Sequence, residues 1–366
     1  MNRIILIGNG FDLAHGLKTG YKNFINNYWE KIENNIRKDN EDRYFRNECI
    51  SFDLKYVDDF NRIQLLANYN NKFLETITRK LGLNSWTDIE EEYYIALKSI
   101  IDNNNVMFNI SPKYPENKTK QMKYSSIDEL NDCFNQVKID LEQYLKQEYQ
   151  TNFKEGDIRN KSIYHNLLMI IGSKFNIKDF ITKEEIPHEM KPDNILFVNF
   201  NYTPTEGLYY GPNAGIKADS IHIHGELYND HNPIIFGYGD ELDENYQRIL
   251  RNGDNRLLEN VKSIKYAETD NYKRILSFIN SDDYQIFIMG HSCGNSDRTL
   301  LNTLFEHRNC QSIKLFYYEK KNEKGEKMSD NFSDTYRNIT RNFTNFANLR
   351  SKVVDKTNSI PLPQIK

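Results

Sequence analysis

The sequence lacks several features that would assign a protein to a class at once. Its four cysteines are scattered, with no Cys-x-x-Cys pair, which argues against a zinc ribbon and against a disulfide framework. The longest apolar runs, such as 195–198 and 286–289, are too short to span a bilayer. No charged-then-apolar leader precedes the first apolar run. We therefore expect a cytoplasmic protein with no membrane partner.

A strong excess of one charge is also absent. The 48 Lys and Arg residues nearly balance 52 Asp and Glu residues, for a formal net charge of −4, so the chain as a whole has no clear nucleic-acid signature. Hydrophobic residues make up only 38%, but aromatic residues reach 13%. Because large rings fill a core with few residues, this composition is compatible with an ordered α/β protein of 366 residues.

Five short apolar runs have the length and composition of buried strands, and Gly, Asn, Asp or Ser bounds most of them. These runs are residues 3–7, 194–200, 220–224, 284–290 and 312–318. Helical periodicity fills the intervals, most clearly over 127–145, where Ser126 and Glu129 form a potential capping box. A second helix is predicted from about Thr87.

Strands that alternate with helices predict a parallel, Rossmann-like sheet flanked by helices. We expect its core to comprise residues 1–21 and 191–320, with a large, mainly helical insertion over 22–190 after the first strand. Within that insertion, the polar stretch 111–124 reads as a loop. Residues 321–366 are expected to form a C-terminal helix and a loosely ordered tail.

The first candidate site is the glycine turn after the first strand, Gly8-Asn9-Gly10-Phe11-Asp12. A strand, a glycine turn and a helix N-terminus present backbone N–H groups to a ligand, and Asp12 could cap the helix. The dinucleotide fingerprint G-x-G-x-x-G is incomplete, because Leu13 stands where its third glycine belongs. A purely structural strand-to-helix turn is the alternative.

Two further clusters follow predicted strands. Asn201 lies at the exit of the 194–200 strand and could bind ribose hydroxyls or a water, or simply form a turn before Pro204. Strand alternation would place His222 and His224 on one face. His224, next to a glycine, is the better general base, although a single histidine is most often structural. We expect no metal.

The fourth cluster is the small-residue loop after the 284–290 strand. Gly290, His291 and Ser292 permit close approach of a ligand, and Asp297 is expected to open the next helix. A plain structural loop is the alternative.

Taken in order, these clusters resemble the AbiH family of bacteriophage abortive-infection proteins. The resemblance is carried by residues 5–21, which read ILIGNGFDLAHGLKTGY, and by Phe-Asn-Tyr-Thr at 200–203, Ile-His-Gly at 223–225 and Gly-His-Ser at 290–292. Residues 86–90 also resemble that family's helical Trp-x-Asp-x-Glu element. The resemblance implies a role in phage defence, with a phage-derived trigger as one partner.

A more distant similarity is to sirtuin-like NAD-binding domains. The matching positions are the glycine turn at Gly8 and Gly10, the active-site Asn at Asn201, the catalytic His at His224, and the ribose loop at Gly290 and Ser292. Asp12 and Thr203 depart from that pattern, and the paired-cysteine zinc module is absent. The similarity implies a sirtuin-like sheet that hydrolyses NAD, with NAD as substrate rather than cofactor.

The leading hypothesis is therefore an NAD glycohydrolase, or an enzyme acting on a related nucleotide, in which Asn201 holds a ribose hydroxyl or water and His224 accepts a proton. The expected nucleotide-binding residues are Gly8, Asn9, Gly10, Phe11, Asp12, Gly290, His291, Ser292 and Asp297. The alternatives are a non-catalytic nucleotide-binding sensor or scaffold, and a metal-dependent nuclease that uses Asp12, Asp88 and Glu90. The chain could also form a homo-oligomer.

Overall fold

The centre of the molecule is a six-stranded sheet in which every neighbouring pair of strands is parallel. The computed structural model describes residues 1–38, 44–53, 63–81, 89–102, 106–109, 119–181, 190–212, 214–239, 241 and 243–365. The strands are β1 (Asn2–Ile7), β7 (Ile195–Asn199), β8 (Ala218–His222), β9 (Tyr284–Met289), β10 (Cys310–Tyr317) and β13 (Ile360–Pro361). They lie in the order β13-β10-β9-β1-β7-β8.

The predicted parallel sheet is confirmed, and all five predicted strands are present with ends that differ by at most two residues. The sixth strand, β13, differs from the expectation of a loosely ordered tail. The Leu362 N–H donates to Tyr317 O (2.8 Å) and the Ile365 N–H donates to Ala14 O (2.9 Å). A strand this short, with a proline, is compatible with an edge position, where a missing N–H breaks no ladder.

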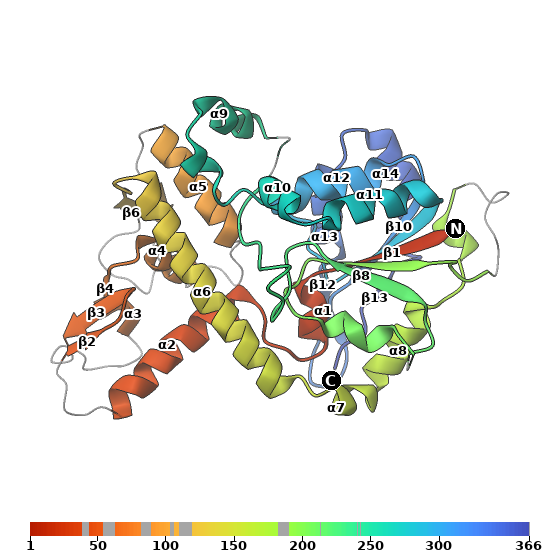
Figure 1. Cartoon of the computed structure of the whole chain (residues 1–366). Helices are drawn as coiled ribbons and strands as arrows, with labels where there is room; N and C mark the ends of the chain where they lie inside the picture. Colours follow the sequence, from red (N-terminus) through yellow and green to blue (C-terminus); the bar gives the residue numbers. More distant parts are fainter. Residues whose placement is uncertain are drawn as a thin grey trace.

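Helices cover both faces of the sheet (Figure 1). One face packs against α11 (Asn271–Ser281), α12 (Arg298–Glu306), α13 (Phe332–Arg341) and α14 (Phe346–Lys352). The other packs against α1 (Asn9–Ala14), α7 (Glu155–Arg159) and α8 (Ser162–Ile171). In β1, Ile4 and Leu6 face the first layer while Ile5 and Ile7 face the second. This alternation explains why the strand is apolar along its whole length.

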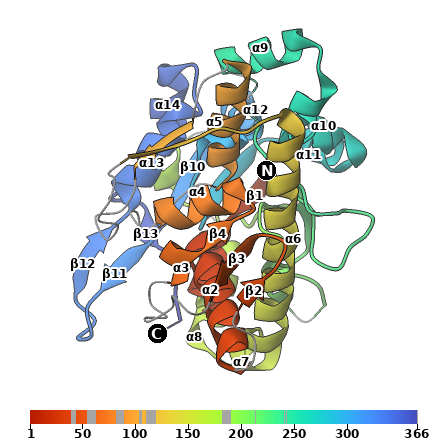
Figure 2. The same ribbon diagram turned by 90° about the vertical axis from the view of Figure 1, so that its left-hand side faces the viewer.

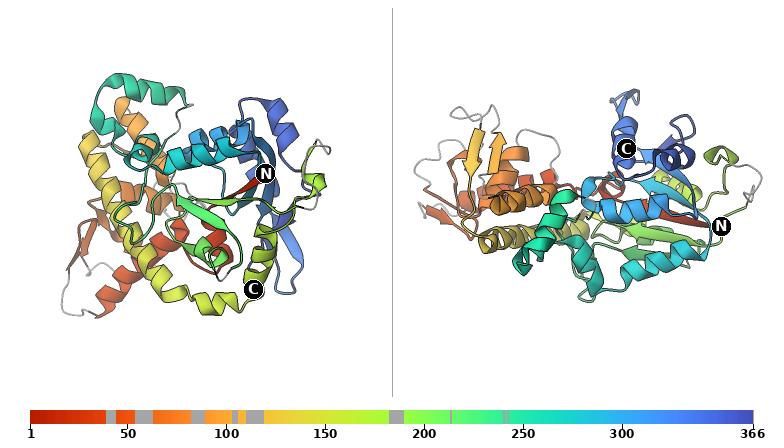
Figure 3. Two further views of the ribbon diagram at one scale, coloured as in Figure 1. Left: turned by 45° about the vertical axis from the view of Figure 1, so that its right-hand side comes forward. Right: turned by 90° about the horizontal axis from the view of Figure 1, so that it is seen from above.

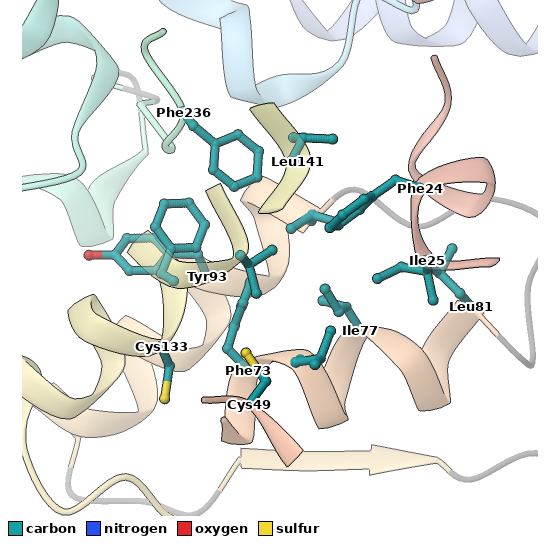
Figure 4. Close-up of a cluster of buried hydrophobic side chains, with 14 of the residues drawn as sticks. Phe24, Ile25, Cys49, Phe73, Ile77, Leu81, Tyr93, Cys133, Leu141 and Phe236 are labelled. Carbon is teal, nitrogen blue, oxygen red and sulfur yellow. The ribbon is translucent and has the colours of Figure 1, made fainter. Parts of the chain in front are cut away.

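Most of the segment between α1 and α7 forms a second body with its own core, which we call the α2–α6 body. Figure 2 shows it from its outer side. Its helices are α2 (Tyr21–Lys38), α3 (Ile63–Leu66), α4 (Lys72–Leu81), α5 (Ile89–Ile101) and α6 (Ile127–Asn152). Two small antiparallel sheets complete it: β2 (Tyr44–Arg46), β3 (Ile50–Asp53) and β4 (Asn68–Tyr69), and β5 (Val106–Asn109) with β6 (Thr119–Met122). Phe236, from the segment after β8, stacks on Phe134 in this core (Figure 4).

The helix predictions in this body can be compared with the structure. The Glu129 N–H donates to Ser126 Oγ (3.1 Å), so Ser126 caps α6 as predicted, while the Glu129 carboxylate accepts the Ser125 N–H instead of completing the box. The described part of α5 begins at Ile89, and Thr87 lies outside the described residues. Residues 119–122 form β6 rather than loop, and 111–118 lie outside the description.

The remaining elements lie outside the central sheet. They are α9 (Glu244–Asn252), α10 (Lys262–Lys265), the hairpin β11 (Glu319–Lys321) with β12 (Lys327–Asp330), and the 3-10 turns η3 (Ile177–Asp179), η4 (Thr205–Tyr209), η5 (Asn255–Leu258), η6 (Tyr266–Glu268) and η7 (Asn295–Asp297). Among the described residues, no helix combines the length and apolar character needed to cross a membrane.

The carboxyl ends of the strands point toward the α2–α6 body (Figures 1 and 3). From β1 the chain adds β7 and β8 on one side of the sheet and then returns to add β9 on the other side of β1. In open parallel sheets, ligands bind outside the carboxyl ends at such a reversal. The fold therefore predicts a site between β1 and β9, facing the helices.

Candidate functional site

A cavity of about 690 Å³ lies at this position. Residues in or after all six strands of the central sheet line it, and the α2–α6 body closes it from the opposite side through Lys22, Glu90 and Leu141. Its volume falls within the range of about 300–1,000 Å³ that small-molecule sites occupy. The cavity brings together residues of all four clusters singled out in the sequence.

The glycine turn after β1 packs directly against the loop after β9. The Gly10 N–H donates to Gly290 O (2.8 Å), and a Cβ on Gly10 would lie 2.9 Å from Gly290 Cα. Gly290 has φ +78°, and its own Cβ would lie 2.1 Å from the Phe11 nitrogen. The absence of these Cβ atoms is what lets the two loops touch. Gly8, Gly10 and Gly290 also line the cavity.

Of the other residues in these two loops that we expected to bind a nucleotide, some line the cavity and one is buried in the core. Asn9 and Ser292 are exposed and line the cavity, and the Asn9 Oδ1 accepts the Thr19 hydroxyl (2.6 Å). Phe11, in contrast, is fully buried against His15 and Tyr209 beneath the turn and is not among the cavity-lining residues.

Asp12 does not cap α1, so that prediction is wrong. The N-cap residue is Gly8, and Asp12 lies within the helix, 1% exposed, where its carboxylate accepts the Thr203 hydroxyl. Burial raises the pKa of Asp12 to about 6, against the lowering effect of that hydrogen bond. The two positions that depart from the sirtuin-like pattern thus contact each other.

Asn201 connects the turn after β7 to the turn after β1. Its Nδ2 donates to Gly8 O (3.0 Å), and its backbone N–H donates to Asn199 Oδ1 (2.7 Å). The Oδ1 of Asn201 has no hydrogen-bond partner within the described parts of the chain, and the residue lines the cavity. A fixed amide oxygen is therefore presented at the sheet edge.

His222 and His224 occupy different environments. Because β8 ends at His222, His224 lies in the following turn and strand alternation does not relate the two. His222 Nε2 lies 2.8 Å from Glu206 Oε1, and the Glu206 carboxylate raises the pKa of His222 although burial acts in the opposite direction. His222 therefore belongs to a buried pair beside the cavity and is not one of its lining residues.

His224 lines the cavity, and its Nε2 lies 3.1 Å from both Asp297 Oδ1 and the Tyr266 hydroxyl. Burial lowers the pKa of His224, and the positive charge of the neighbouring Lys262 acts in the same direction. Asp297 acts in the opposite direction, and the resulting pKa is about 4. The imidazole is neutral at neutral pH. No described residue hydrogen-bonds to its Nδ1.

Asp297 is the centre of a buried charge cluster. Its Oδ1 lies 3.0 Å from Lys262 Nζ, which also lies 2.8 Å from Glu90 Oε2. Burial would raise the pKa of Asp297, but Lys262 and then His224 hold it well below its usual range. The Asp297 side chain makes no helix-capping hydrogen bond, although the residue does precede α12 as predicted.

His291 contacts the same carboxylate from the loop after β9. Its Nε2 lies 3.4 Å from Asp297 Oδ2, and its Nδ1 accepts the Cys293 N–H (3.0 Å). The proton of a neutral His291 is therefore on Nε2, the nitrogen nearer to Asp297. The ring of His291 also packs on Phe200, 4.1 Å between centroids.

Sequence reasoning did not find Lys262, Tyr266 or Glu206. Lys262 and Glu90 are 172 positions apart, and a lysine in a short polar helix gives no sign that it is buried. Tyr266 follows in the same polar stretch. In the sequence, only the run of acidic residues around Glu90 could have pointed to a buried cation as its partner.

Two of the three potential nuclease ligands, Asp12 and Glu90, lie among the described residues and do not belong to a metal cluster. Asp12 is bonded to Thr203 and Glu90 to Lys262, while Asp88 lies outside the described residues. Across the described ranges, no group of three or more His, Cys, Asp or Glu side chains is placed to hold a metal ion.

Fold and site together define a parallel α/β protein with a ligand-sized cavity at the strand carboxyl ends, built on a buried acid–histidine–lysine cluster. Residues 4–319 match the family described as "Bacteriophage abortive infection AbiH", and the chain belongs to this family. The family resemblance predicted from the sequence is thereby confirmed, and with it a place among phage abortive-infection proteins. No curated protein matches the chain.

Proposed function

We propose that this phage-defence protein binds NAD, or a closely related nucleotide, in the cavity and hydrolyses its nicotinamide–ribose bond. The strand order supports a nucleotide ligand: numbered along the chain, the six central strands lie in the order 3-2-1-4-5-6, which is the order of the doubly wound dinucleotide-binding fold. NAD in particular is suggested by the sequence similarity of Asn201 and His224 to sirtuin-like domains, since both residues line the cavity.

The observation that carries the proposal is the contact between His224 and Asp297 on the cavity wall. With its proton on Nε2, which lies 3.1 Å from Asp297 Oδ1 and hydrogen-bonds to the Tyr266 hydroxyl, the imidazole keeps its Nδ1 lone pair for a proton from water. The ionised Asp297 orients the ring and stabilises the imidazolium that forms, as the acid does in an acid–histidine pair. Lys262 keeps Asp297 ionised in this buried position.

The reaction requires one bond to break and one to form. The bond between the nicotinamide nitrogen and ribose C1′ breaks, and nicotinamide leaves with the electron pair as a neutral molecule. Water then bonds to C1′ and loses its proton to His224 Nδ1. The oxocarbenium-like transition state is strongly electrophilic, so a base as weak as His224 suffices. The amide oxygen of Asn201 would hold a ribose hydroxyl or the attacking water.

The test is NAD consumption by purified protein, followed by mass spectrometry with and without phage lysate. We expect wild type to release nicotinamide and His224→Ala to lose about 10²–10⁴-fold in rate. His231→Ala is the matched control, because His231 is exposed and absent from the cavity wall. If the protein binds NAD without cleaving it, the result would refute catalysis and favour a sensor role. Full activity of His224→Ala would show that His224 is not the base.

A further inference from the structure

The cavity continues well beyond the cluster at His224. Its opposite end lies at the carboxyl ends of β10 and β13 and at the start of α13, where it is lined by Tyr318, Asn331, Thr335, Leu362 and Gln364. Because neighbouring strands lie about 4.8 Å apart, the six strands from β8 to β13 span about 24 Å. None of the residues at this far end has a part in the bond cleavage described above.

The far end presents polar atoms without partners. Asn331 Oδ1 accepts the Tyr318 N–H (2.7 Å), which holds the side chain and leaves its NH₂ group to donate. Gln364 Nε2 donates to Glu319 O (3.4 Å), which leaves its Oε1 to accept. The hydroxyl of Thr335, a residue only 6% exposed, has no hydrogen-bond partner in the described ranges. A hydroxyl on a cavity wall can take its partner from a ligand or from water.

The same end has an apolar surface suited to a flat ring. Tyr318 is 50% exposed although it lines the cavity, and the buried Leu362 lies on the wall beside it. An aromatic side chain left uncovered, next to amide donors and acceptors, is the combination that binds nucleic-acid bases by stacking and by edge hydrogen bonds.

We propose that this end is a purine-base subsite that selects adenine, so that the ligand of the cavity is an adenine dinucleotide and not a mononucleotide. The inference rests on the proposed function, which places the nicotinamide half of the dinucleotide at His224. Adenine carries an amino donor beside ring-nitrogen acceptors, which complements the Gln364 Oε1 acceptor and the Asn331 NH₂ donor. Guanine presents a carbonyl acceptor where adenine has the amino group, which leaves Gln364 Oε1 facing another acceptor.

Between the two ends, the cavity wall suits the linking phosphates. Lys22, in the first turn of α2, is exposed on the wall, and within the described chain no carboxylate forms an ion pair with it. Gly20, two residues earlier, lies close to the Asn9 amide, so the start of α2 that carries Lys22 lies beside the glycine turn. A dinucleotide would then cover the reversal point of the sheet, with its cleavable bond at His224 and its adenine at Tyr318.

Calorimetric titration of AMP, GMP, ADP-ribose and nicotinamide mononucleotide tests the subsite by binding alone. We expect wild type to bind AMP more tightly than GMP. Tyr318→Ala should weaken AMP and ADP-ribose about tenfold or more through lost stacking and leave nicotinamide mononucleotide unchanged, while Tyr318→Phe binds as wild type does. Tyr44→Ala is the control, since Tyr44 is equally exposed on β2, away from this cavity.

The outcomes separate this inference from the proposed function. Tyr318-dependent AMP binding in a protein that leaves NAD intact would support the subsite and refute the hydrolase. NAD hydrolysis with AMP binding unaffected by Tyr318→Ala would refute the subsite and support the hydrolase. Failure of folded wild type to bind AMP or ADP-ribose would refute the subsite, while NAD consumption alone decides the hydrolase.

Discussion

Lys262 Nζ lies 3.0 Å from Asp297 Oδ1, and the lysine is only 1% exposed. Asp297 and Glu90 together raise the pKa of Lys262 well above its usual value although burial acts in the opposite direction. A lysine from α10 thus connects a carboxylate of the α2–α6 body to one at the edge of the central sheet. Both parts of the molecule depend on it to form one cavity wall.

Replacing Lys262 by methionine should destabilise the protein by about 3–5 kcal/mol, because two buried carboxylates lose their cation. Chemical denaturation at pH 7.5 measures the change. Lys265→Met removes an exposed lysine three residues away in the same helix, whose partner is the exposed Glu268, and should change stability by less than about 1 kcal/mol. Equal effects of the two substitutions would show that the buried cluster contributes nothing to stability.

Acidification should destabilise the protein partly through His224. Its pKa in the folded state is about 4, below the 6.5 of an unperturbed histidine, so the unfolded state takes up the proton first as pH falls. Stability is therefore lost between about pH 6.5 and pH 4. The melting temperature of His224→Gln, measured across this range, should fall less steeply than that of wild type. Parallel curves would contradict the lowered pKa.

Catalysis should follow the same titration. If neutral His224 is the base, the rate of NAD hydrolysis is constant from about pH 6 upward and decreases as pH falls through about 4. Rates from initial nicotinamide release give this profile. A decline centred near pH 6.5 would instead indicate a solvated histidine.

Asp12 should have the opposite pH dependence. Burial raises its folded-state pKa to about 6 from an ordinary 3.8, so the folded state holds the proton more tightly and stability falls as pH rises through this window. Asp12→Asn removes the buried charge and should stabilise the protein by up to about 3 kcal/mol at pH 7.5, with little change at pH 4. Asp132→Asn, at an exposed position on α6, should have no such pH-dependent effect.

A comparison of Gly290→Ala with Gly253→Ala should separate the energetic cost of losing the loop contact from the cost of backbone strain. Gly290 and Gly253 have nearly the same φ, +78° and +80°, but only a Cβ on Gly290 would meet another residue, at 2.1 Å from the Phe11 nitrogen. Gly253→Ala should therefore cost only the strain of about 1–2 kcal/mol, while Gly290→Ala costs clearly more and weakens nucleotide binding. If Gly290→Ala and Gly253→Ala lose similar amounts of stability in denaturation and of nucleotide affinity in titration, the contact between the two loops contributes nothing to either.

The central sheet was predictable because each long strand carries its own signal. Runs such as 284–289 are apolar, short and bounded by polar residues, and burial on both faces requires that composition. β13 could not be found in this way, because Ile360 and Pro361 pair at an edge through Tyr317 and its neighbours, which the local sequence does not show. The paired strands of the α2–α6 body are also short, with two to four residues each.

The candidate site was predictable only in part, and for a related reason. The carboxyl ends of parallel strands meet at one edge, so Gly8, Asn201, His224 and Gly290 could be expected to lie together. The partners of these residues come from elsewhere. Lys262 lies in a polar segment, and Asp12 resembles a helix cap until Thr203 is seen against it. Ion pairs and hydrogen bonds between distant segments leave no periodic trace in a sequence.

The position of β1 has a consequence for biosynthesis. Of the six central strands β1 is synthesised earliest, yet its two neighbours in the sheet are formed by Ile195–Asn199 and Tyr284–Met289. Such non-local pairing is slow to form and leaves an apolar strand exposed in the meantime. The loop contact between Gly10 and Gly290 cannot exist before both strands are in place. A nascent chain therefore carries no assembled cavity until Tyr284–Met289 and the loop after it have been translated.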